Sequence, residues 1–513
     1  MTSIQAAFRW LDTRRLATAI VFIAVFTMAV RAPADSDTWW HLQAGRVTVE
    51  QGQMLQTDLF SHTRYGSRWV NHSWLSQVLL YVLFDHFSYA GLGLWMGVVV
   101  TVAFVFVYLQ MEGSVFARAF IIVLAAATSG VIWSARPQLL SFLLTAVVTY
   151  VLYLFKWRRI NRLWLLPPLF VLWVNLHAGY ALGFMVLAAF VAGELFNHVY
   201  RAWERAPERE PKPSDDPILA WRDIAWVVGA ALVSALVLVI NPNTTRMWTY
   251  YLETVRIDVL QDFIQEWRSP DFHPLHTQPF IWLLLGTMAV MGLSKRRVDG
   301  TDLALVGGFA YAALLAGRNM GPFALVAAPA LSRHLTAMVS SSRTPSQDLA
   351  GVATGGRRCP TTAQAAINWS LLVLVAALGA AKVQRPLRTG FNEALQRDQL
   401  PADAMAWIED KQPAGQMFNH YNWGGYLIWR LWPEYRVFVD GRTDLYGNEF
   451  LREYLAVQTA QPGFDETLDT YDVDWLIMPS GGAFSRVLAC DGDWVKAYRD
   501  DVAAIWLREG TEE

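Results

Sequence analysis

The chain contains very little cysteine and little charge. Of its 513 residues only two are cysteines, Cys359 and Cys490. Two thiols cannot form a disulfide framework or a zinc site built from cysteines. Only 17% of the residues are charged, where a soluble protein has about 25%, and 54% are hydrophobic. These values exclude an ordinary soluble protein and indicate a polytopic membrane protein.

Neither sign of charge is in excess, and the common nucleotide and hydrolase motifs are absent. Lys and Arg number 42 and Asp and Glu 44, which leaves a formal net charge of −2. Without a basic field, nucleic acid is not an expected partner. The sequence has no Walker loop, G-x-G-x-x-G, H-E-x-x-H or G-x-S-x-G motif. We therefore expect energy to come from an activated substrate or an ion gradient rather than from ATP.

Long apolar runs are abundant, and a helix of roughly 20 such residues crosses a bilayer. The first run, from about residue 16 to 30, follows three arginines and has no cleavage site after it, so we interpret it as a retained anchor. With this run the sequence predicts about eleven spans. The other ten lie near residues 90–110, 119–133, 138–155, 163–176, 179–198, 224–240, 279–293, 302–317, 320–332 and 366–381.

The loop charges predict the orientation. With the N-terminus in the cytoplasm, the inner loops contain 20 Lys and Arg residues and the outer loops contain 9. Cytoplasmic loops of membrane proteins carry this excess. We therefore predict a cytoplasmic N-terminus, with residues 156–159 and 295–297 as cytoplasmic anchors and the C-terminal tail outside the cytoplasm.

Three regions lie outside the predicted spans. The first outer loop covers residues 31–89, and within it residues 74–87 predict an amphipathic helix on the membrane surface. The second outer loop covers residues 241–278. The tail predicts a small α/β domain, with strands at 435–439 and 475–478 and helices at 401–410 and 449–458. We thus expect a transmembrane region at 1–384 and a domain at 385–513, with a linker at 340–358.

The informative polar residues are all predicted on the outer side of the membrane. Ionisable groups near membrane depth are costly and usually line a cavity or a pathway. Several of them, contributed by different helices, predict one polar cavity that opens outward. The predicted site consists of eight residues: Asp35, Asp37, His41, His72, Arg136, His177, Glu266 and Arg318.

Each of these residues also has a purely structural interpretation. Asp35 and Asp37 are suited to cap the helix that begins near Thr38. His41 and His72 could satisfy hydrogen bonds in the core, and His177 could simply lie at the membrane interface. The arginines could anchor span ends, and Glu266 could be solvated. Alternatively, one aspartate caps the helix while the other is a general base, because burial near an apolar surface raises the proton affinity of a carboxylate.

Four stretches of the sequence carry a family resemblance. They are D-x-D-x-W-W-H-L-x-x-G (35–45), W-V-N-H-x-W-L (69–75), N-x-Y-x-W-G-G-Y-L (419–427) and V-D-G-R-x-D (439–444). With a first span followed by a long outer loop that has an acidic motif near its start, the sequence resembles the GT-C superfamily of membrane glycosyltransferases. The resemblance is closest to a bacterial group of polytopic GT-C-like proteins.

The resemblance implies a function and a location. A sugar would pass from a polyprenyl-phosphate donor to a glycan, lipid or protein acceptor at the outer face of the bacterial inner membrane. Asp37 or Asp35 would be the base, and Arg136 or Arg318 would neutralise the leaving phosphate. Oxygens of Asp and Glu could hold a divalent ion, Mg²⁺ or Mn²⁺. Many relatives have adjacent Asp and Glu residues here, whereas these two aspartates are separated by Ser36, which leaves the identity of the base open.

Other interpretations remain open at this point. Residues 422–426 and 440–442 could bind an acceptor glycan, or they could simply form tight turns, where Gly and Asp are common. The whole chain could instead be a transporter or flippase for a lipid-linked or small polar substrate. It could also be a non-catalytic membrane assembly protein.

Overall fold

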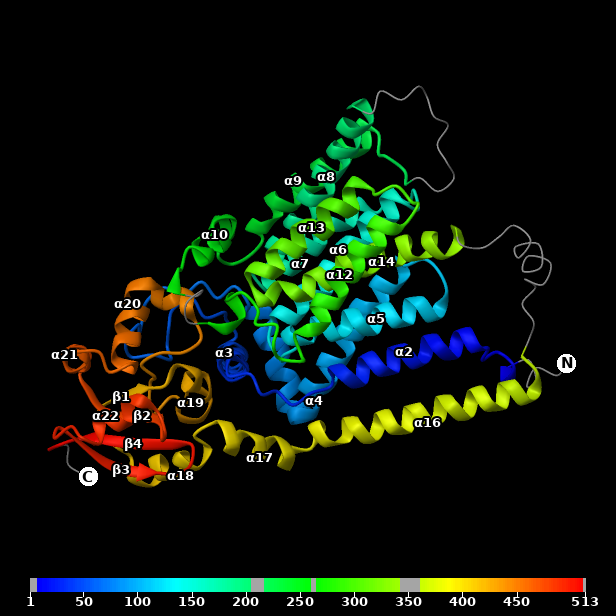
Figure 1. Cartoon of the computed structure of the whole chain (residues 1–513). Coiled ribbons are helices and arrows are strands. Elements are labelled where there is room, and N and C mark those ends of the chain that lie inside the picture. Colours follow the sequence, from blue (N-terminus) through cyan, green and yellow to red (C-terminus); the bar gives the residue numbers. More distant parts are fainter. Residues whose placement is uncertain (1–6, 204–215, 260–263, 342–359, 511–513) are drawn as a thin grey trace.

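The computed structural model describes residues 7–203, 216–259, 264–341 and 360–510. Most of the chain is a bundle of apolar helices, with a smaller α/β region at one end (Figure 1). The apolar runs form helices because a helix in lipid satisfies every backbone hydrogen bond within its own segment. The bundle helices are α2 (Thr13–Ala29), α4 (Trp74–Leu109), α5 (Val115–Ser129), α6 (Gln138–Lys156), α7 (Leu166–Leu176), α8 (Tyr180–Trp203), α9 (Trp221–Leu236), α12 (Gln278–Leu293), α13 (Gly300–Leu315), α14 (Met320–Ser341) and α16 (Thr362–Leu387).

The predicted polytopic helical architecture is confirmed. Each of the eleven predicted runs overlaps one of these helices. Among the described residues, seven helices are long and apolar enough to cross a membrane, namely those built on α4, α5, α6, α8, α9, α14 and α16. The helices at 163–176, 278–293 and 300–315 are apolar but shorter, and α2 has 17 residues. The total of about eleven spans therefore stays a prediction.

The first outer loop contains two helices. After α2 the chain forms α3 (Asp37–Gln51), an extended turn with a bridge between Thr57 and Arg68, and then α4. Ser88, with φ 52° and ψ −145°, divides α4 into two helices. The first of these covers the short helix predicted over 74–87.

The C-terminal region is the small α/β domain that the sequence predicts. Its four strands have the order β1-β2-β4-β3, in which β1 and β2 are parallel and the other pairs antiparallel. The strands are β1 (Gln416–Asn419), β2 (Val473–Pro479), β3 (Trp494–Arg499) and β4 (Ala503–Arg508). The helices between α16 and the C-terminus are α17 (Thr389–Gln399), α18 (Ala402–Lys411), α19 (Gly424–Leu431), α20 (Thr443–Gln458), α21 (Phe464–Thr470) and α22 (Ala483–Leu488).

One predicted strand is wrong. Residues 475–478 lie in β2, but residues 435–439 do not join the sheet. Val437 forms only an isolated parallel bridge with Ser61 of the first outer loop. The next backbone N–H, that of Phe438, donates to the side-chain oxygen of Asn419 at 2.8 Å. These contacts take the place of the hydrogen bonds that a neighbouring strand would make. Apart from residues 340 and 341 of α14, the predicted linker at 340–358 lies outside the described residues.

The C-terminal domain is fixed to the first outer loop by a buried arginine. Arg442 donates to Asp58 at 2.6 Å and to Asp440 at 2.6 Å, and all three side chains are fully buried. The guanidinium also lies over the ring of Trp69, 4.9 Å from its centroid. The described N-terminal end of α2 lies at the opposite end of the bundle from this domain (Figure 1).

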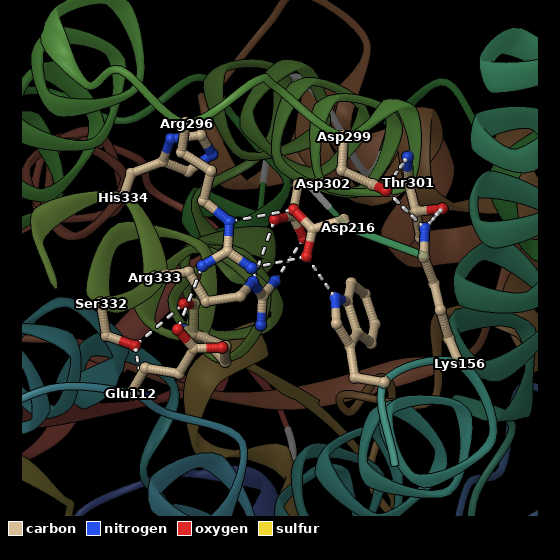
Figure 2. Close-up of polar contacts among 12 residues, drawn as sticks. Glu112, Lys156, Asp216, Arg296, Asp299, Thr301, Asp302, Ser332, Arg333 and His334 are labelled. Atoms are coloured by element: carbon tan, nitrogen blue, oxygen red, sulfur yellow. Dashed lines mark hydrogen bonds and ion pairs between the residues drawn. The ribbon is translucent and has the colours of Figure 1, made fainter. Parts of the chain in front are cut away.

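A second charged cluster surrounds Lys156, the last residue of α6 (Figure 2). Lys156 is fully buried between Glu194 and Asp299, with its ammonium 2.7 Å from Asp299 and bonded to Glu194. It also donates to Thr301 at 2.8 Å. The prediction that Lys156 is a cytoplasmic anchor is therefore wrong for its side chain, which turns inward to a carboxylate within α8 and to another at the start of α13.

Two more arginines complete this second cluster. Arg296, of the predicted anchor 295–297, contacts Asp216 at 2.6 Å and Glu112 at 3.0 Å. Arg333 on α14 pairs with Asp302 on α13, and both side chains are buried. The cluster thus links α6, α8, α13 and α14 through charged pairs, of which those of Lys156 and Arg333 are buried.

Candidate active site

A large cavity lies where the helix bundle meets the C-terminal domain. Its volume is about 1550 Å³, and residues of both outer loops, of the short turns between helices and of the C-terminal domain line it. All eight residues of the predicted site line this cavity: Asp35, Asp37, His41, His72, Arg136, His177, Glu266 and Arg318.

Arg136 is the centre of the charged part of the cavity. It lies between the 3-10 turn after α5 and the start of α6. Its Nε is 3.0 Å from Asp35, its Nη1 is 2.7 Å from Asp37, and its Nη2 is 2.7 Å from Glu266. Three carboxylates on one guanidinium leave this group with an excess of negative charge, although each pair is a strong charge-assisted hydrogen bond.

The two aspartates of the acidic motif do different things. Asp35 accepts a hydrogen bond from the backbone N–H of Asp37 at 3.0 Å, which caps the start of α3. Asp37 accepts instead from the indole N–H of Trp40 at 3.2 Å and from Arg136. Both carboxylates line the cavity and contact Arg136, and Asp35 also orders the start of α3.

The pKa values of Asp37 and Glu266 are shifted in opposite directions. Burial raises the pKa of Asp37, the attraction of Arg136 opposes this and the neighbouring Asp35 reinforces it, so that the pKa is about 6. Burial also raises the pKa of Glu266, but Arg136 and Arg318 outweigh it and bring the pKa to about 2. Asp37 is thus the carboxylate with a proton affinity suited to a base near neutral pH.

Backbone of the C-terminal domain closes one side of Asp37. A Cβ atom added at Gly441 would lie 1.9 Å from a carboxylate oxygen of Asp37, and one added at Gly425 would lie 2.5 Å from the carbonyl oxygen of Ser36. Only glycine fits such close approaches. The glycines of the two C-terminal motifs therefore hold this domain against the acidic motif.

Three histidines form a further part of the wall. The rings of His72 and His177 have centroids 5.7 Å apart, and Trp40 packs on His41 at 3.6 Å. Burial lowers the pKa of all three, and in His72 the carboxylate of Asp444 partly offsets this. All three imidazoles are therefore neutral near pH 7.

Arg318 is farther from its carboxylate partner than Arg136 is from its three partners. It lies in the short turn between α13 and α14, over the ring of Trp267 at 4.4 Å. Its distance to Glu266 is 3.8 Å, longer than any contact of Arg136 with its carboxylates. An anion that enters the cavity therefore replaces weaker carboxylate contacts at Arg318 than at Arg136.

Two residues of the site were not predicted from the sequence. Tyr250, on α10 (Tyr250–Val255), binds His72 at 2.6 Å and donates to Asp444 at 2.9 Å. Asp444 ends the motif V-D-G-R-x-D, so that motif was the available signal for it. Nothing in the sequence distinguishes Tyr250 from Tyr251 beside it.

The carboxylates do not fit a divalent ion in this arrangement. Asp35, Asp37 and Glu266 are the oxygen donors that Mg²⁺ prefers, yet each turns an oxygen to a different nitrogen of Arg136, and the guanidinium lies where an ion would have to bind. Among the described residues no group of three or more His, Cys, Asp or Glu side chains is placed to hold a metal. The divalent ion stays a prediction, and no step below uses it.

Comparisons with known proteins identify the fold. No protein-family model and no curated protein matches the chain. The structure superposes on the oligosaccharyltransferase of Archaeoglobus fulgidus with a TM-score of 0.53 and 13% identity, over 92% of this chain and 70% of that one. The same enzyme tethered to an acceptor peptide with the NVT sequon gives 0.53 and 14%, with the same coverage. The chain has the GT-C fold.

A further match has a lower TM-score. ArnT of Cupriavidus metallidurans, in complex with undecaprenyl phosphate, gives a TM-score of 0.46 at 14% identity, over 96% of this chain and 97% of that one. At 13–14% identity the likeness to the oligosaccharyltransferase shows the fold alone, so any activity has to be argued from the cavity.

Proposed function

We propose that this protein is a membrane glycosyltransferase that moves a sugar from a polyprenyl-phosphate donor to a glycan, lipid or protein acceptor. The observation that carries the proposal is the convergence of Asp37, Arg136, Glu266 and Arg318 from four segments onto one cavity within a GT-C fold. A carboxylate with a pKa of about 6 and an accessible arginine are the two groups that such a transfer needs.

In the proposed reaction Asp37 takes the proton from an acceptor hydroxyl or amine. The acceptor atom then bonds to the anomeric carbon, and the bond from that carbon to the phosphate oxygen breaks. The electron pair leaves with the phosphate, whose charge Arg318 stabilises. Arg136 and Asp35 are positioning residues, because both hold the carboxylate of Asp37 and its helix start in place.

The test replaces the two aspartates singly with asparagine. Asp37→Asn should reduce sugar transfer by about 10²–10⁴-fold, which is the usual contribution of a general base, while Asp35→Asn should reduce it less. Asp85→Asn, on the exposed part of α4, is the matched control and should leave transfer unchanged. Full modification in cells with both site variants at normal membrane levels would contradict the assignment. Uptake by proteoliposomes with no covalent product would favour a transporter.

We also propose that the protein lies in the bacterial inner membrane with its N-terminus in the cytoplasm. The loop charges and the placement of the C-terminal domain at the far end of the bundle support this orientation (Figure 1). Cys490 is exposed in the C-terminal domain, whereas Cys359 falls in a predicted inner loop. A membrane-impermeant maleimide should label spheroplasts containing the wild type but not Cys490→Ser. Equal labelling of both would contradict the orientation.

A further inference from the structure

The histidine wall of the cavity contains two imidazoles whose hydrogen-bonding roles are fixed by their neighbours. His72 precedes α4, and His177 lies in the turn between α7 and α8. Both line the cavity, and their ring centroids are 5.7 Å apart. In each ring the Nδ1 atom has partners, and no side chain among the described residues forms a hydrogen bond with Nε2.

The partner of His72 makes its Nδ1 a donor. The hydroxyl of Tyr250 has one proton, which it donates to the carboxylate of Asp444 at 2.9 Å. The same hydroxyl is 2.6 Å from Nδ1 of His72. Its oxygen must then accept a proton from Nδ1–H. In the neutral ring this leaves Nε2 of His72 with a lone pair, so that it is an acceptor.

The neighbours of His177 make its Nδ1 an acceptor. The backbone N–H of Gly179 donates to this atom at 3.0 Å, and an N–H can do nothing else. The hydroxyl of Ser141 is also 2.8 Å from it, while that hydroxyl accepts from the indole N–H of Trp173 at 2.8 Å. The proton of His177 is therefore on Nε2, which is a donor.

The two free Nε2 atoms thus have opposite polarity on neighbouring rings. A hydroxyl group donates one hydrogen bond and accepts others, so a single hydroxyl can satisfy both atoms. A phosphate dianion only accepts and an ammonium only donates, so either would leave one ring unsatisfied. Two hydrogen bonds of about 2.8 Å through one oxygen can span rings this far apart.

We propose that His72 and His177 form a subsite for a sugar hydroxyl of the donor substrate, with Tyr250 and Asp444 as positioning residues that fix the polarity of His72. This inference rests on the proposed function for the identity of the ligand as a lipid-linked sugar. The phosphate of the same donor would be bound elsewhere, by the arginines of the cavity.

The first test reads the two tautomers directly. In the full-length protein with ¹⁵N-labelled histidine, NMR at pH 7 should show His72 protonated on Nδ1 and His177 on Nε2. Tyr250→Phe should change the His72 signals and leave those of His177. Tyr251→Phe is the matched control, since Tyr251 also lines the cavity and should change neither. The same tautomer at both histidines would overturn the proposal.

The second test separates the hydroxyl from the phosphate. The probes are undecaprenyl phosphate and undecaprenyl-phosphate-linked glucose, mannose and galactose. The wild type should bind at least one sugar-bearing lipid more tightly than the bare phosphate, and His72→Phe or His177→Phe should weaken that binding by about tenfold, as expected for one lost hydrogen bond. Binding of bare undecaprenyl phosphate should not change.

The outcomes distinguish this subsite from the proposed function. An equal loss for the bare lipid phosphate, or no preference for any of the three sugars, overturns the subsite. Asp37→Asn should keep the sugar preference while losing transfer. A wild type that prefers a sugar-bearing lipid but transfers nothing would leave the subsite standing and contradict the transferase.

Discussion

Two of the charged clusters, the cavity cluster around Arg136 and the remote cluster around Lys156, lie at opposite ends of the helix bundle and differ in access to water. In the cavity cluster, Arg136 is 13% exposed and Asp37 23%. In the remote cluster, Lys156 and Glu194 are fully buried and Asp299 is 2% exposed. Basic side chains paired with carboxylates therefore line a large cavity at one end of the bundle and link helices at the other. Access, rather than the presence of charge, distinguishes a candidate site from a structural contact.

The largest expected effect comes from breaking the remote cluster. Lys156→Met leaves two buried carboxylates without their cation, which costs about 3–5 kcal/mol of stability. Unfolding of the purified protein in detergent should show this loss. Lys295→Met is the control, because Lys295 is exposed at the same end of the bundle, and its stability should match the wild type. A stable Lys156→Met variant would mean that this cluster is not a structural contact.

The next largest effect is expected from disrupting the contact between Gly441 of the C-terminal domain and Asp37. Gly441→Ala puts a methyl group where the carboxylate of Asp37 lies, so the carboxylate must move. Misplacing a catalytic group by about 1 Å can cost 10²-fold in rate, and sugar-transfer kinetics should show a loss of about this size. Gly481→Ala, in the same domain with open space around it, should transfer normally. An unimpaired Gly441→Ala variant would contradict the role of this contact.

The pH dependence of transfer sharpens the assignment of the base. With a pKa of about 6 for Asp37, the deprotonated form predominates at pH 7 and is the minor form at pH 5. The rate should therefore fall by about tenfold from pH 7 to pH 5. Burial lowers the pKa of the three histidines, so they do not account for an inflection near 6. A flat profile across this range would exclude Asp37 as the base.

The smallest expected effect is that of metal removal. Because Arg136 already lies between the three carboxylates, transfer should be unchanged by a chelator. Rates measured with EDTA, and after adding Mg²⁺ or Mn²⁺, test this. A loss with EDTA that Mg²⁺ restores would show that the carboxylates rearrange around an ion.

The sequence was sufficient for the helices and for the convergence of the site. Apolar runs predict helices from composition alone. The acids and histidines near the outer membrane side were expected to line one cavity, because ionisable groups are costly against lipid. The direction in which a side chain points was harder to predict. Lys156 was predicted to be an anchor because its partner Asp299 lies 143 residues away in the sequence. Residues 435–439 have strand composition, yet their backbone groups bond to the first outer loop and to the side chain of Asn419 instead of joining the sheet. Tyr250 was missed because its role depends on two distant residues.

The approach of Gly441 to Asp37 also has a consequence for biosynthesis. The ribosome makes the acidic motif early and the glycine motif near the end, and in the proposed orientation the glycine must be exported before the two can meet. The pocket around Asp37 is therefore completed only once the tail has been translocated and has folded. A nascent chain that stops after the last predicted span would insert its helices and still lack one wall of the cavity around Asp37.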